Sequence, residues 1–167
     1  VIPDAALLAF RFACCILVIV TLGWVALNPK GSSDFPLYFK EREVRPRKVV
    51  GPTRLAAFTM WHFALIGVSY AVSGAATWIH ISGGTVPEWI LISSPILFST
   101  SFASAILVTC VITFQIVPNN LAKGLPVSRL FTWYEIVMHN GNVALMGFSL
   151  LINGMQVEWV FIAFPTV

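Results

Sequence analysis

Two histidines in long apolar stretches are the residues of this chain best suited to chemistry, because an imidazole nitrogen can act as a base or as a ligand. His62 follows Thr59 by three residues, and His139 precedes Asn142 by three. A hydroxyl group beside an imidazole is the minimum for nucleophilic cleavage of an ester. The candidate catalytic residues are therefore Thr59 and His139. Alternatively, His62, His139 and Asn142 could bind a cofactor or pigment.

No known catalytic or metal-binding signature accompanies these residues. The chain has no GxSxG, HExxH or CxxCH pattern. Its three cysteines, Cys14, Cys15 and Cys110, lie inside apolar segments, a spacing that predicts neither a disulfide framework nor a metal site. The sequence requires no cofactor, although bound lipid or pigment remains possible in principle.

The segment 133–153, WYEIVMHNGNVALMGFSLLIN, places its polar side chains on one face of a helix. At about 100° per residue they fall within about 80° of arc. The segment 55–79 carries a second polar stripe that includes Thr59 and His62. Polar groups are costly in hydrocarbon, so we expect the two stripes to face each other or a cavity. The residues expected to pack helices together are Ser69, Ser73, Thr77, Glu135, Ser149 and Asn153.

The composition indicates an integral membrane protein. Hydrophobic residues make up 57% of the 167-residue chain and charged residues only 10%, with a mean hydropathy of +0.85; soluble domains carry about 25% charged residues. We therefore predict an all-α, polytopic membrane helix bundle forming one transmembrane domain, 1–167. The predicted spans are 5–27, 55–79, 89–117, 133–153 and a partial fifth at 159–167.

The basic residues are concentrated in two of the predicted loops. Loop 28–54 has seven Lys or Arg against three acids, and with loop 118–132 it holds nine of the ten Lys and Arg residues. These loops are predicted to share the positive side of the membrane, so that Thr59 and His139 enter from the same side. Because the charges flank spans, nucleic acid is excluded as a partner, whereas membrane lipids are expected.

Three segments carry a resemblance to a family of membrane proteins. They are FTMWHFALIGVSYAVSGAAT (58–77), FASAILVTCVITFQIVPN (102–119) and HNGNVALMGFSLLINGMQVEWVFIAFP (139–165). Between Arg54 and Pro165 the chain resembles the androgen-induced and rolling-stone-like multi-pass proteins. Some members hydrolyse fatty-acid esters of hydroxy fatty acids with an intramembrane threonine and a histidine.

The resemblance maps that threonine onto Thr59 and the catalytic histidine onto Asn142. Asparagine cannot act as a general base, so this departure argues against hydrolysis. The leading interpretation is a non-catalytic accessory or scaffold subunit of a larger membrane complex, for example of respiratory or photosynthetic type. The alternative is an intramembrane fatty-acid-ester hydrolase that uses Thr59, followed by a transporter or channel.

Overall fold

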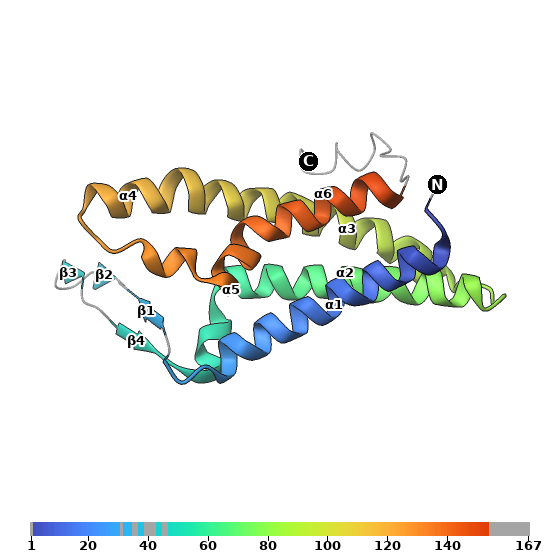
Figure 1. Cartoon of the computed structure of the whole chain (residues 1–167), viewed down its shortest axis with the longest axis horizontal. Helices are drawn as coiled ribbons and strands as arrows, with labels where there is room; N and C mark the ends of the chain where they lie inside the picture. Colours follow the sequence, from blue (N-terminus) through green and yellow to red (C-terminus); the bar gives the residue numbers. More distant parts are fainter. Residues whose placement is uncertain (1, 31, 35–36, 39–42, 45–46, 154–167) are drawn as a thin grey trace.

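The computed structural model is a bundle of long helices and describes residues 2–30, 32–34, 37–38, 43–44 and 47–153 (Figure 1). Four helical segments in this part of the chain are long and apolar enough to cross a membrane: Asp4–Leu27, Phe58–Ile81, Glu88–Ala122 and Trp133–Ile152. The predicted all-α membrane helix bundle is confirmed. The partial fifth span predicted at 159–167 lies outside the described residues.

The first two segments are regular helices, α1 (Asp4–Leu27) and α2 (Phe58–Ile81). Each of the other two contains a π-helical turn. Helix α3 (Glu88–Cys110) continues through the π turn η2 (Val111–Ile116) into α4 (Val117–Ala122). The last segment comprises α5 (Trp133–Ile136), the π turn η4 (Val137–Gly141) and α6 (Asn142–Asn153). Turns of this kind are rare and occur frequently at functional sites.

Two helix boundaries differ from the predicted spans, and a proline lies near each of them. The third span was expected to end at 117, but the helix continues to Ala122, and Pro118 lies directly after the π turn η2 inside this continuous helix. The second span was expected from 55, whereas α2 begins at Phe58. The preceding residues form the 3₁₀ helix η1 (Gly51–Ala56), which has Pro52 near its start.

The connection between α1 and α2 contains short strands. Strand β1 (Ser32–Asp34) pairs antiparallel with β4 (Arg47–Val49), and β2 (Leu37–Tyr38) pairs with β3 (Glu43–Val44). Figure 1 shows these strands and the α4–α5 connection at one end of the bundle, with the α2–α3 turn at the other. The two basic loops therefore share an end, while the prediction that this end is the positive side of a membrane stays a prediction.

Glycines end two of the helices. Gly83 (φ +76°) follows α2 and Gly124 (φ +65°) follows α4, and the amide N–H of each bonds back to a carbonyl of the helix it terminates. Glycine adopts this left-handed conformation without the steric cost that a Cβ would bring. The chain can therefore reverse direction within a few residues after each helix.

Helix α2 occupies the centre of the bundle and packs against both α1 and α3. It lies close to α1 at Gly67, where an added Cβ would lie 2.8 Å from Cγ1 of Val18. Small residues allow such close backbone approach between membrane helices. The largest fully buried apolar side chains at this core are Val18, Val25, Phe63, Ile66, Met138 and Met146.

Candidate functional site

The candidate site is built around an acid–imidazole pair on the last helical segment. Oε2 of Glu135, in α5, lies 2.6 Å from Nε2 of His139, in the π turn η4. The two side chains are only 17% and 5% exposed, respectively. Residues four apart on a helix meet on one face, which explains the pairing. The pair fixes the orientation of the imidazole and leaves its Nδ1 buried with no hydrogen-bond partner in the described part of the chain.

A hydroxyl group of α3 forms a hydrogen bond with the π turn η4. Oγ1 of Thr109 donates a hydrogen bond to the backbone carbonyl of His139 and lies 3.2 Å from Oδ1 of Asn142. Asn142 is fully buried, and its Nδ2 donates to the carbonyl of Met138 at 2.7 Å. The Asn142 amide is therefore engaged with its own helix and with α3. These hydrogen bonds indicate that Asn142 holds the helices together rather than binding a ligand.

His62 reaches this region from α2 and is 3% exposed. It faces the backbone of Thr59 one turn earlier and lies within electrostatic range of His139. Neither ring nitrogen of His62 completes a hydrogen bond within the described residues. Buried polar atoms are rarely left unpaired. His62 and His139 thus contribute three unpaired nitrogen atoms to one part of the bundle interior.

Thr59 lies in the first turn of α2 and is partly exposed. Its backbone faces His62, which places the two residues together as their spacing suggested. Among the described residues its hydroxyl makes no hydrogen bond to either histidine, so a formed hydroxyl–imidazole dyad is not present at Thr59. Thr59 and His139 stay candidate catalytic residues without that contact.

The described residues contain no group of three His, Cys, Asp or Glu side chains that could hold a metal ion. The pair His62 and His139 offers imidazole nitrogens, and Glu135 already occupies one of them. The remaining nitrogens could bind a pigment as axial ligands. Asn142 is the third residue expected to bind a cofactor. Its amide already forms hydrogen bonds with the carbonyl of Met138 and with the hydroxyl of Thr109.

The residues expected to pack helices lie mostly inside the bundle. Ser69, Thr77 and Ser149 are buried. Ser73 Oγ is 2.9 Å from Ser94 Oγ, which links α2 to α3. Asn153 ends α6, and its side chain lies outside the described part.

Two further cross-links join the helices at a distance from the histidines. The Arg11 guanidinium of α1 donates to the carbonyl of Ser73 at 2.8 Å and also bonds Oγ1 of Thr77. Tyr70 OH donates to the carbonyl of Leu145 at 3.0 Å, which links α2 to α6. Bonds of this type hold membrane helices together, because lipid supplies no hydrogen-bond partners.

Sequence reasoning missed the role of Arg54. This side chain is 5% exposed, and its NH1 donates to the carbonyl of Val25 at 2.7 Å. Pro29 stands four residues after Val25 and has no N–H, so the helix itself cannot satisfy that carbonyl. Arg54 supplies the missing donor and also lies over the ring of Tyr134, 5.7 Å from its centroid. A proline two residues after the end of α1, and thus four residues after Val25, was the available signal.

Comparison with protein-family models, with curated proteins and with solved structures finds no match for this chain.

Proposed function

We propose that this protein is a non-catalytic, multi-span membrane subunit whose polar side chains lock its own helices together. Its outer surface would meet lipid and the other subunits of a larger membrane complex. The observation that carries this proposal is the direction of the polar stripes. Their hydroxyl, amide and imidazole groups are turned into the bundle, and hydroxyl groups bond across helices, as in the contacts of Thr109 with His139 and of Ser73 with Ser94.

The outer surface supports the same function. Its large side chains are apolar or aromatic, including Trp61 at 69%, Phe114 at 76% and Leu151 at 81% exposed. Such a surface is compatible with lipid and with the apolar faces of neighbouring subunits.

The test is the state of the protein in its own membrane. After extraction in mild detergent, native electrophoresis should place the chain in a complex much larger than its own 18.3 kDa. Trp61→Ala and Phe114→Ala should lower the fraction in that complex, whereas Thr100→Val, whose hydroxyl bonds only its own helix, should not. Migration of the wild-type chain alone would contradict the proposal. Visible absorbance in the same band would assign a pigment, and His62→Ala or His139→Ala should then remove it.

A second candidate, an intramembrane fatty-acid-ester hydrolase, is favoured by one specific observation. Glu135 holds Nε2 of His139, which leaves the lone pair of Nδ1 available inside the bundle. An acid that orients an imidazole whose other nitrogen accepts a proton is the arrangement of a general base. In this mechanism His139, rather than Asn142, takes the base role.

The chemical step would use Thr59 as the nucleophile. Its hydroxyl oxygen would bond to the ester carbonyl carbon as its proton passes to Nδ1 of His139, and that proton would then leave with the alcohol product. Water would release the fatty acid from the acyl-threonine. Local movement at the start of α2 has to bring Thr59 to the imidazole, because the hydroxyl–imidazole contact is not formed.

Purified protein and a fluorogenic fatty ester test this candidate. Thr59→Ala and His139→Gln should each abolish turnover while the protein keeps its elution volume and helix content. Glu135→Gln should lower kcat more than it changes KM, because the orientation of the imidazole matters in the transition state. Thr100→Val is the matched control. Absence of wild-type turnover, or unchanged turnover in Thr59→Ala, would reject the hydrolase.

A further inference from the structure

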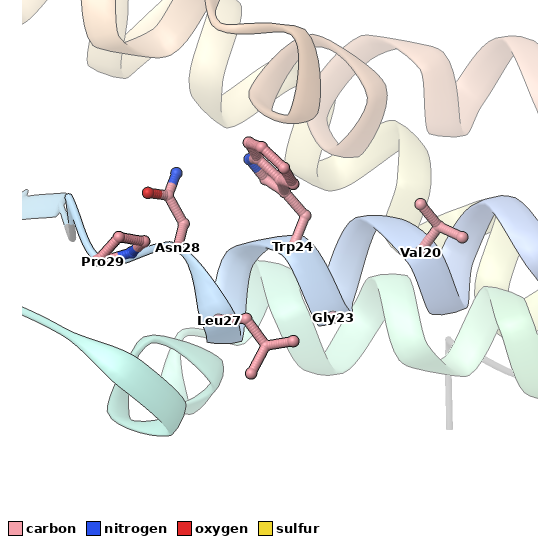
Figure 2. Close-up of a pocket in the computed structure, with 6 residues that line it drawn as sticks. All are labelled: Val20, Gly23, Trp24, Leu27, Asn28 and Pro29. Carbon is pink, nitrogen blue, oxygen red and sulfur yellow. The ribbon is translucent and has the colours of Figure 1, made fainter.

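An apolar hollow of about 440 Å³ lies on the surface of α1 near its C-terminal end, and its lining residues are Val20, Gly23, Trp24, Leu27, Asn28 and Pro29 (Figure 2). Figure 2 shows the indole of Trp24 and the amide of Asn28 rising from the same side of the helix. A Cβ added at Gly23 would meet no atom within 4 Å, so the glycine keeps this space open.

The hollow lies at the level where aromatic residues gather at this end of the bundle. The ring of Trp24 contacts that of Trp133, with 5.8 Å between centroids, and Trp133 contacts Tyr134 in turn. Tryptophan and tyrosine are enriched where a membrane meets water. We therefore expect the apolar lining from Val20 to Leu27 to face the hydrocarbon of a membrane, with Asn28 and Pro29 at the level of the headgroups.

Positive charge stands beside the open end of the hollow. Lys30 is exposed, and its backbone N–H bonds to Oδ1 of Asn28 at 3.0 Å, which fixes the turn next to the lining residues. The next segment, β1, pairs with β4, where Ser33 stands opposite Lys48, itself exposed. The connection that follows the apolar lining thus carries the exposed Lys30 and Lys48, and its one acidic residue in β1, Asp34, stands opposite Arg47.

We propose that this hollow binds a phospholipid with an acidic headgroup. One acyl chain lies along Val20, Gly23 and Leu27, and the phosphate lies beside Lys30. The apolar lining binds an acyl chain, and the nearby lysines favour a negatively charged headgroup. Together they distinguish an acidic phospholipid from the zwitterionic lipid of the bulk membrane. The site lies apart from the histidines, and it requires neither catalysis nor a partner subunit.

Native mass spectrometry of the full chain in detergent tests the site, with phosphatidylglycerol and phosphatidylcholine of identical acyl chains as probes. The wild-type protein should retain phosphatidylglycerol at least about fivefold better, the preference that one nearby basic side chain supplies. Lys30→Gln should remove most of that preference, whereas Lys123→Gln, an exposed lysine at the α4–α5 connection, should leave it.

Substitutions that fill the hollow are the second test of this proposal. Gly23→Leu should lower phosphatidylglycerol retention about as strongly, and Gly23→Ala should lower it partly. Gly147→Leu is the matched control, because a Cβ at Gly147 in α6 also meets no atom within 4 Å. Equal retention of the two lipids, unchanged retention in folded Gly23→Leu and Gly23→Ala, or displacement of the lipid by inorganic phosphate alone would overturn the proposal.

Discussion

Oε2 of Glu135 and Nε2 of His139 lie 2.6 Å apart in a part of the bundle where both side chains are largely shielded from solvent. The contact joins an α-helical turn to a π-helical one, and it leaves Nδ1 of His139 as a buried atom without a partner among the described residues. This contact could stabilise the fold, or it could orient His139 as a base. Its contribution to the free energy of unfolding and its contribution to ester turnover therefore have to be measured separately.

Replacing one member of the Glu135–His139 pair should lower the free energy of unfolding more than replacing both. Glu135→Leu leaves the second nitrogen of His139 buried and unpaired as well, and should lower the free energy of unfolding by about 1–3 kcal/mol. The double variant Glu135→Leu/His139→Leu should recover most of that loss, because an apolar pair needs no partners. Unfolding in mixed detergent and dodecyl sulfate measures both values.

The control for this cycle is Glu88→Leu, since Glu88 is exposed in the first turn of α3. Its effect should stay below about 1 kcal/mol, the range of a charge near a helix end. Losses that simply add in the double variant would show that Glu135 and His139 are not energetically coupled.

Arg54 should be much more sensitive to substitution than the exposed Lys48 of the same loop. Arg54→Met removes the donor to the Val25 carbonyl, which Pro29 cannot replace, and should destabilise the protein by about 2–3 kcal/mol. Lys48→Met, at an exposed position on β4, should change stability by less than about 0.5 kcal/mol. Similar melting temperatures for the two variants would contradict the capping role of Arg54.

The sequence was sufficient to predict the helices but not their irregularities. Hydropathy identified the four spans because each needs about 20 apolar residues to cross a bilayer. The π turn at His139 was not predictable, since it spans only the five residues Val137–Gly141, too few to change a periodicity that is read over the whole segment. The polar stripes were visible as periodic patterns, whereas the contact of Thr109 with His139 joins residues 30 apart. Such a contact depends on how α3 packs against the last segment.

The close approach of α1 and α2 predicts a specific pair of compensating substitutions. Gly67→Ala places a Cβ 2.8 Å from Cγ1 of Val18, a contact that requires the Val18 side chain or one of the helices to shift, and should cost about 1–3 kcal/mol. Val18→Ala in the same chain removes the clashing methyl group and should restore part of the loss. Gly147→Ala, which meets open space, should not destabilise the protein. A Gly67→Ala variant as stable as wild type would place the two helices further apart than described.

Thr109 offers the sharpest test of whether α3 holds the π turn in place. Thr109→Val keeps the shape of the side chain but removes the hydroxyl that reaches the His139 carbonyl and the Asn142 amide. The expected loss is about 1–2 kcal/mol, the upper range for hydrogen bonds between membrane helices. Thr100→Val, which breaks only a bond to its own helix, should lose less than about 0.5 kcal/mol. Because the lost contacts join α3 to η4, hydrogen exchange should increase at residues 137–142 in Thr109→Val and stay unchanged there in Thr100→Val. Equal exchange in both variants would show that the π turn is held by its own helix alone.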